Sequence, residues 1–392
     1  ATPGRTPRSS RAPENTSPEP VAGYNGEPER LKYASDPAWH RTRWPFVSYR
    51  KKSIMSRNQL TCCFLGLGVL FAMSPFASAE DSWVVYEGNK GPGQGKHIVF
   101  VTGDDEYRSE EGMPMLAKIL AVRHGFKCTV LFAIDPQTKQ ITPSYQNNIP
   151  GLHQLDSADL MVVFLRFREL PDAQMKHFVK YTNSGKPIVG LRTSTHAFNY
   201  AKNRKSPYAN YSYNSQGWTG GFGQQVLGDT WINHHGHHGR ESTRGILNPK
   251  FKTHAILTGV RDIWGPTDVY GVRNLPKNAQ VLVHGQVVAG MQADDPPVQG
   301  AKNKPMMPLV WTKLHTSESG QQARIVCTTM GASMDLQSAG LRRLLVNACY
   351  WGLRLEDQIN PASNVDYVGP YKPTPFGFGS FTKGVRPSDH EL

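Results

Sequence analysis

Residues 187–200 have the sequence PIVGLRTSTHAFNY, and this stretch decides the fold assignment. Its apolar part, residues 187–191, follows Gly185-Lys186 and has the length and composition of a fully buried strand in a parallel sheet. Polar residues follow at once, at 192–196. Ligands of open α/β sheets bind just beyond the carboxyl ends of the strands. The turn 192–196 is therefore predicted either to line a site or, like ordinary polar turns, only to cap the sheet.

The same order of an apolar strand followed by polar residues occurs upstream of this stretch. Three further strands are predicted, at 97–102, 128–134 and 160–165. A helix is predicted between the first two of these strands, and a second helix at 172–182. Ser109 is expected to cap the first helix and Gly125 to end it. Strands that alternate with helices at this spacing favour a doubly wound parallel sheet with right-handed crossovers.

The carboxyl ends of these predicted strands carry polar and charged residues. In a parallel sheet they all meet at one edge, which is the expected position of a binding or catalytic site. The residues that arrive there are Asp104, Glu106, Tyr107, Arg108, Asp135, Arg166, Arg168, Arg192, Thr193, Ser194, Thr195 and His196.

The second half of the chain is richer in strand patterns. Strands are predicted at 269–272, 279–283, 309–313 and 324–328, followed by a closing helix at 336–355. After Asn360 the chain is rich in Pro, Gly and Phe and has no hydrophobic period. We expect residues 356–392 to form an irregular tail that wraps the surface or stays loose, beyond a folded α/β domain at about 95–355.

A histidine-rich loop lies between the two halves. Residues 231–240 have the sequence WINHHGHHGR, with four histidines within five residues. Histidine acts as a general acid or base near neutral pH and is a common metal ligand. Because Gly236 and Gly239 tighten the loop, at most two of the four rings can converge on one point. The alternative is an exposed run of loop histidines.

The first 79 residues are expected to lie outside the folded domain. Residues 1–54 are rich in Pro, Arg, Ser and Glu and are interpreted as a non-native or disordered leader. Residues 55–79 begin with Met55 and combine a positive charge, an apolar run and a small-residue site ending at Ala79, which is the pattern of a secretory signal peptide. The apolar run is too short for a stable membrane span. Export to the periplasm or the medium is predicted, with a mature protein that starts near Glu80.

Charge and cysteine content exclude some classes of function. The net charge is +13, of which +5 lies in residues 1–54, +1 in 55–79 and +7 in 80–392, without a basic cluster. Nucleic-acid binding needs a clustered basic patch and is not expected. Beyond residue 79 only Cys128, Cys327 and Cys349 remain, without C-x-x-C spacing. They are expected to be buried free thiols rather than ligands of structural zinc.

Several of these stretches together resemble the trehalose-utilisation ThuA-like domain family. They are the segment VTGDDEYRSEE at 101–111, IVGLRTSTHAF at 188–198, the histidine loop, PLVWT at 308–312, residues 324–331 and the helix that ends in NACYW at 347–351. The likeness covers about 95–355 and is greatest to exported members from planctomycete-type bacteria. It implies a flavodoxin-like parallel sheet of the class I glutamine amidotransferase-like type.

The resemblance implies an enzyme that acts on a carbohydrate, with an oxidised (3-keto) glycoside as its candidate substrate. Isomerisation, elimination or hydrolysis beside the ketone would then use histidines as acid and base. The predicted catalytic residues are His196, His235 and His238 as acid and base, and Glu106, which would orient one of the histidines. The predicted substrate-binding residues are Asp104, Tyr107, Arg108, Arg166, Arg168, Arg192, Thr193 and Ser194.

Glutaminase activity itself is not expected. A glutamine amidotransferase needs a nucleophilic cysteine on the turn after a central strand. The turn here is Arg192-Thr193-Ser194, and Ser194 lacks the paired glycines of a G-x-S-x-G nucleophile elbow. The architecture is therefore expected without its nucleophile.

Two other classes of function remain open in the sequence. One is a non-catalytic sugar-binding protein of the envelope, in which Tyr208, Tyr211, Tyr213 and Trp218 stack on sugar faces. The other is a metal-dependent hydrolase with a divalent metal at the loop from His234 to His238, where imidazole suits zinc, nickel or iron. A small-molecule carbohydrate is the expected partner in each case. The sequence leaves the substrate, the metal and the oligomeric state open.

Overall fold

A single mixed sheet of ten strands organises the part of the chain that the computed structural model describes, residues 82–392 together with Ala1. The predicted leader and signal peptide fall outside these residues. The strand order across the sheet is β1-β3-β2-β4-β5-β10-β9-β8-β6-β7. Within the residues that the structure describes, none of the helices combines the length and the hydropathy that a membrane span requires.

Five neighbouring strands form a parallel core. They are β3 (Lys127–Leu131), β2 (His97–Gly103), β4 (Leu160–Leu165), β5 (Ile188–Leu191) and β10 (Gln322–Thr328). Gly103 pairs with Leu165, and Leu191 pairs with Thr328. This register brings the carboxyl ends of β2, β4, β5 and β10 to one edge of the sheet.

Antiparallel strands extend the sheet on both sides of this core. β1 (Trp83–Tyr86) pairs with β3. On the other side follow β9 (Met307–Thr316), β8 (Gln280–Val288), β6 (Ser242–Leu247) and β7 (Trp264–Gly265). The expected parallel core with β-rich additions is therefore present, within a sheet that is mixed rather than parallel throughout.

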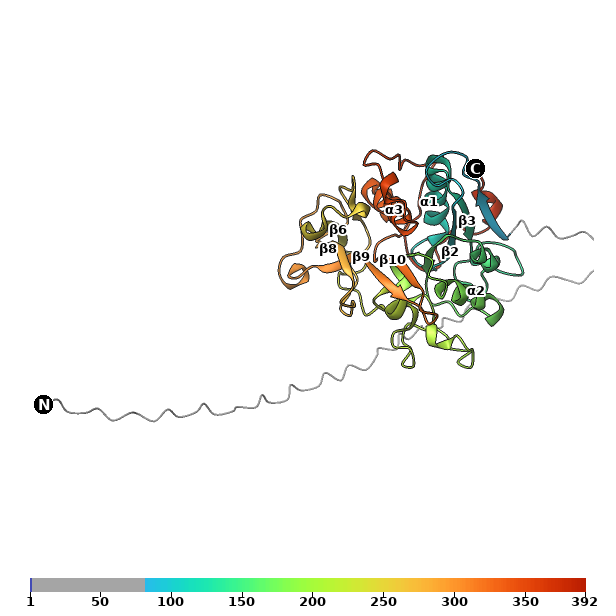
Figure 1. Ribbon diagram of the computed structural model, residues 1–392, viewed down its shortest axis with the longest axis horizontal. Coiled ribbons are helices and arrows are strands. Elements are labelled where there is room, and N and C mark those ends of the chain that lie inside the picture. The colour runs from blue at the N-terminus through green and yellow to red at the C-terminus, as the bar shows by residue number, and fades with distance from the viewer. Residues whose placement is uncertain (2–81) are drawn as a thin grey trace, which may run out of the picture. The chain divides into compact units, whose positions relative to one another are not determined.

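Helices cover both faces of the parallel core (Figure 1). α1 (Ser109–His124) and α3 (Ala339–Gly352) pack on one face, and α2 (Asp172–Thr182) packs on the other. Successive side chains of a strand point to opposite faces. In β2, Ile98 and Phe100 accordingly join the core under α1 and α3, whereas Val99 and Val101 join the core over α2. A strand buried on both faces needs a continuous apolar run, as the sequence here has.

Several predicted elements differ from the structure. Residues 269–272 are not a strand, because only Tyr270 makes a bridge there, to His234. The strand expected at 128–134 ends at Leu131. The helix expected at 336–355 is shorter at both ends: it begins after its cap, Ser338, and ends at Gly352. Ser109 does not cap α1; its hydroxyl accepts hydrogen bonds from the backbone N–H groups of Gly103 and Asp104.

The three cysteines of the described residues are buried free thiols, which confirms that prediction.

The tail, residues 356–392, is packed against the domain and ends near β1 (Figure 1). The Tyr86 hydroxyl donates to the carbonyl of His390, and the Ile141 N–H donates to the carbonyl of Val385. The His390 ring stacks on Phe132 with ring centroids 5.3 Å apart. Burial, with the nearby charge of Lys118, lowers the pKa of His390 to about 4.

Protonation of His390 in acid is expected to lower the free energy of unfolding. The His390 pKa is lower in the folded than in the unfolded chain, so its contribution is complete above pH 6.5 and is lost as pH falls to about 4. The loss is about 3 kcal/mol in the free energy of unfolding, which urea titrations at pH 7 and pH 4 measure. His390→Phe keeps a ring on Phe132 and removes the titration, so it should lose about 3 kcal/mol less than wild type. Equal losses in the two proteins would contradict this assignment.

Candidate functional site

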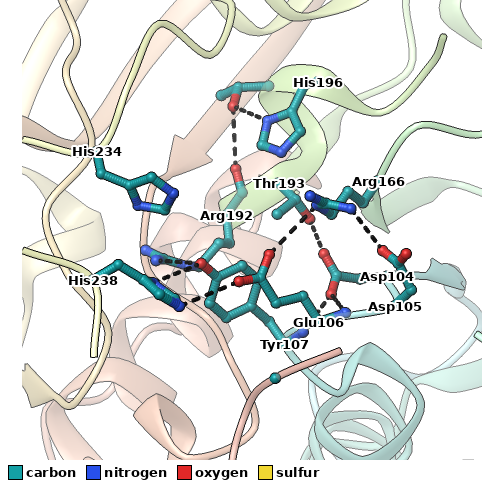
Figure 2. Close-up of polar contacts among 12 residues, drawn as sticks. Asp104, Asp105, Glu106, Tyr107, Arg166, Arg192, Thr193, His196, His234 and His238 are labelled. Carbon is teal, nitrogen blue, oxygen red and sulfur yellow. Dashed lines mark hydrogen bonds and ion pairs between the residues drawn. The ribbon is translucent and has the colours of Figure 1, made fainter. Parts of the chain in front are cut away.

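A cavity of about 320 Å³ lies where the carboxyl ends of β2, β4 and β5 meet the histidine loop. Its walls combine aromatic rings with ionisable groups, of which Figure 2 shows Glu106, Arg166, His196, His234 and His238. The lining residues are Glu106, Arg166, Phe167, His196, Trp231, His234, His238, Tyr270 and Phe378. A larger hollow of about 590 Å³ lies elsewhere, at 144–147, 169–171 and 202–203, where Glu169 and Lys202 are the only charged lining residues.

The backbone is strained where three strands end at this edge. Arg108 after β2, Phe167 after β4 and Arg192 after β5 have φ values of 60°, 49° and 41°. Non-glycine residues adopt this left-handed region at a cost of about 1–3 kcal/mol each, and such residues cluster at functional sites. Of the three, only Phe167 lines the cavity, whereas the side chains of Arg108 and Arg192 are completely buried.

Asp268 is the buried centre of the polar network. Its Oδ2 lies 2.7 Å from His234 Nδ1, and its Oδ1 lies 3.1 Å from His238 Nδ1. Arg192 Nη2 donates to Oδ1 at 2.9 Å. Burial alone would raise the pKa of Asp268, but the hydrogen bonds to the two histidines and the Arg192 charge hold it well below its usual range. Asp268 is therefore a carboxylate that orients two imidazoles.

Arg192 fixes Asp268 from inside the protein. Its side chain is completely buried, and its guanidinium lies 4.2 Å from the ring centroid of Tyr107 and 4.1 Å from that of Tyr270. Nη1 donates to the carbonyls of Asp268, at 3.0 Å, and Thr329, at 2.7 Å. The Arg192 side chain thus contacts protein groups rather than the cavity.

His238 connects Asp268 with Glu106. Its Nε2 lies 3.4 Å from Glu106 Oε1, and Glu106 Oε2 lies 3.5 Å from Arg166 Nε, as the dashed lines in Figure 2 show. The hydrogen bond to Asp268 raises the pKa of His238. Burial, with the charge of Asp104, raises the pKa of Glu106 against the opposing effect of Arg166. Two ionisable groups whose pKa values are both raised therefore face each other at the cavity wall.

His196 lies in the opposite wall. It is 3% exposed and packs between Phe167, at 4.9 Å between ring centroids, and Trp231, at 5.3 Å. Burial, together with the charges of Arg166 and Arg192, lowers the pKa of His196 well below its usual value. The ring is neutral at physiological pH, so it can polarise or hydrogen-bond a ligand but does not carry a charge.

Asp104, Tyr107, Thr193 and Ser194, which the sequence places among substrate-binding residues, are buried in the supporting framework. Asp104 accepts hydrogen bonds from the N–H groups of Glu106 and Tyr107 and from the Thr193 hydroxyl. The Tyr107 hydroxyl accepts from Arg192 at 3.1 Å. Ser194 donates to the carbonyl of Val163 at 2.7 Å. These side chains join the ends of β2, β4 and β5 and hold Glu106 in place.

Arg108, Arg168 and His235 are also not brought into the cavity. Arg108 is buried and binds the tail, and Arg168 is buried and donates to the carbonyls of Arg166, Pro143 and Tyr145. His235 does not line the cavity, and its Nε2 lies 2.8 Å from the carbonyl of Lys302. Of the predicted catalytic residues, the structure brings together Glu106, His196 and His238, with Arg166 beside them.

Sequence reasoning missed Asp268, Tyr270, Trp231 and Phe378 as site residues. Asp268 directly precedes segment 269–272, which the sequence predicts to be a strand. An acidic residue beside an apolar run was the available signal for a site residue at this position. Phe378 lies in the aperiodic tail, where no sequence pattern marks it.

His234, His238 and Asp268 also form a group that can hold a metal ion. One ligand atom of each lies within 4.8 Å of the others. Two imidazole nitrogens and a carboxylate oxygen suit zinc or another first-row transition metal. Arg192 shares the Asp268 carboxylate, so a cation bound here would lie close to a fixed positive charge.

Comparisons with protein-family models and with curated proteins found no match. Among solved structures, the chain is similar to a ThuA-like protein from Parabacteroides merdae, at 16% identity over 66% of this chain and 90% of that one, with a TM-score of 0.42. A ThuA-like protein from Bacteroides uniformis is 15% identical over 70% and 96%, with a TM-score of 0.41. The glutaminase domain of Trypanosoma brucei CTPS is 10% identical over 71% and 98%, with a TM-score of 0.30. Solved structures similar to this chain thus include two described as ThuA-like, the family that its sequence resembles.

Proposed function

We propose that the cavity is the active site of an enzyme that transfers protons on a carbohydrate substrate. The observation that carries this is the chain from Asp268 through His238 to Glu106, at the wall of a cavity lined by aromatic rings. Small-molecule sites are typically apolar and aromatic, with a few placed polar groups, and have volumes of about 300–1,000 Å³. The apolar rings face the C–H groups of a sugar, whereas the carboxylate and imidazoles face its hydroxyl or carbonyl oxygens.

The proposed substrate is an oxidised (3-keto) glycoside, which the resemblance to the ThuA-like family supports. The reaction takes place at the carbon atoms beside its ketone. Glu106 removes the proton from the carbon between the ketone and the anomeric centre. The electron pair forms a carbon–carbon double bond as the glycosidic C–O bond breaks, and His238 protonates the leaving oxygen. Arg166 stabilises the developing negative charge on the ketone oxygen, as fixed cations do for oxyanions. Asp268 and Arg192 orient His238 and His234.

The fold proposed with this function is the flavodoxin-like, class I glutamine amidotransferase-like sheet without glutaminase chemistry. Ser194, on the turn after β5, donates its hydroxyl hydrogen to the backbone of β4 instead of facing the cavity. Burial raises the pKa of all three cysteines of the described residues, so none is an activated nucleophile. The signal peptide pattern at 55–79 supports export as part of the same proposal.

A proton NMR time course tests the proposal. Untagged protein is mixed with 3-keto and with unoxidised disaccharides, and new product resonances are expected with the 3-keto substrates. His238→Ala should lower the rate by a factor of about 10²–10⁴, the usual contribution of a general acid or base. His235→Ala is the matched control, since it removes a histidine of the same loop that does not line the cavity. Broadened sugar resonances without any product would instead establish the non-catalytic sugar-binding function.

A metal-dependent hydrolase is the second candidate, because His234, His238 and Asp268 are within ligand distance of one another. It predicts one equivalent of zinc or another transition metal per chain by elemental analysis, and loss of turnover with a chelator. The proton-transfer enzyme predicts unchanged turnover after chelation. Restoration of activity by one added metal, but not in His234→Ala, would decide for the hydrolase.

A further inference from the structure

A short segment of the tail crosses the edge of the cavity and presents an exposed aromatic ring. This segment, residues 374–380, is called the tail strap. Phe378 is 60% exposed and lines the cavity. Among the large hydrophobic side chains exposed in residues 82–392, it is the only aromatic one. An apolar group left exposed beside a binding cavity commonly marks a contact surface for a ligand.

Hydrogen bonds to two charged side chains hold the tail strap in place. Arg108, which is completely buried, donates from Nη2 to the carbonyl of Gly377 at 2.7 Å and from Nε to the Thr374 hydroxyl at 3.1 Å. The Gly377 N–H donates to the carbonyl of Glu106 at 2.8 Å. Glu111 accepts from the Thr374 N–H at 2.8 Å and from its hydroxyl at 2.6 Å. The strap is therefore tied directly to the backbone of a candidate catalytic residue.

Phe378 and Phe376 face different surroundings. Phe376 points inward, 5.6 Å from the Tyr107 ring and 5.3 Å from the His238 ring. Phe378 lies over Arg166, 4.8 Å from its guanidinium carbon, and Phe167 lies 4.6 Å from the same carbon. The contacts of Phe376 with these two rings account for the packing of the strap, but they do not account for the exposed ring of Phe378 at the mouth of the cavity.

We propose that Phe378 is the platform for a second sugar ring, so that the substrate is a glycoside of at least two rings. The inference rests on the proposed function, because it takes the cavity to hold the reacting ring. At about 320 Å³ the cavity is at the low end of the volumes of small-molecule sites. The ring joined through the bond that breaks therefore lies at the mouth, where the free face of Phe378 stacks on it.

Saturation-transfer NMR and affinity titrations on the full protein test this platform. The probes are methyl α- and β-glucoside, with one ring, and maltose and cellobiose, with two. In wild type, saturation should reach both rings of a bound disaccharide. Phe378→Ala should remove saturation from one ring of the disaccharide. It should also weaken disaccharide binding by about three- to tenfold, which is the usual contribution of one aromatic stacking contact. Binding of the methyl glucosides should change by less than about twofold.

Two control variants separate stacking from indirect effects. Phe378→Tyr keeps the ring and should bind like wild type. Leu314→Ala removes an exposed apolar side chain of β9 that does not line the cavity, and it should leave the affinity for all four probes unchanged.

If Phe378→Ala weakens the binding of one-ring and two-ring probes equally, Phe378 only shields Arg166 and the platform is refuted. If it changes neither, the platform is also refuted while the proposed function stands. Absence of binding of all four probes to wild type would overturn the platform, whereas the 3-keto turnover assay judges the proposed function separately.

Discussion

Glu106→Gln is expected to lower the turnover of the 3-keto substrate by a factor of about 10²–10⁴ without unfolding the protein. Glu106 faces His238 at 3.4 Å and its side chain is 7% exposed, so the substitution keeps the shape and removes the base. The amide cannot accept the substrate proton. Steady-state kinetics give the effect on kcat, and a circular dichroism melt shows that the fold is retained.

Asp105→Asn is the matched control for this variant. Asp105 is the neighbouring residue and also pairs with Arg166, at 3.0 Å, but it has no contact with His238. If Glu106 acted only by positioning Arg166, the two variants would lose similar activity. We expect Asp105→Asn to stay within a few-fold of wild type. Comparable losses in both variants would remove Glu106 from its role as the base.

Arg192→Met is expected to lower the free energy of unfolding by about 3–5 kcal/mol, the usual cost of breaking a buried ion pair by removing one partner. The substitution leaves the buried Asp268 carboxylate without the Arg192 cation. The backbone carbonyls of Asp268 and Thr329 also lose their Arg192 hydrogen-bond donor. Two tyrosine rings also lose a cation between them. Urea unfolding at pH 7, followed by fluorescence, measures the loss.

Arg324→Met is the control for burial. Arg324 also has a carboxylate partner, Glu356 at 2.6 Å, a carbonyl acceptor and an aromatic ring, that of Trp351. Its side chain is 19% exposed, and partly exposed ion pairs contribute about 1 kcal/mol or less. The two variants should therefore differ by at least 2 kcal/mol. Equal losses would show that the Arg192 network does not depend on its burial.

The parallel half of the sheet could be predicted from local pattern. The strand at 160–165 and the helix at 172–182 have the predicted bounds. A strand buried on both faces is a short continuous apolar run, and an amphipathic helix has a period of 3.6 residues, and both patterns are visible in the sequence. The antiparallel half was predicted less well. β6 is only partly buried, with mixed polar and apolar residues, so the run Ser242–Leu247 has no distinct strand pattern.

The candidate site was only partly predictable, because neighbouring residues on one turn face different ways. The sequence alone determined that 104–108, 166–168 and 192–196 meet at the carboxyl edge of a sheet, and that a histidine loop is available. Tertiary structure alone decided that Arg192 turns inward to Asp268, 76 residues away, and that His238 faces Glu106 whereas His235 contacts Lys302. The physical reason is that strand periodicity is a local property, whereas the pairing of buried charges depends on which distant groups the packed chain brings together.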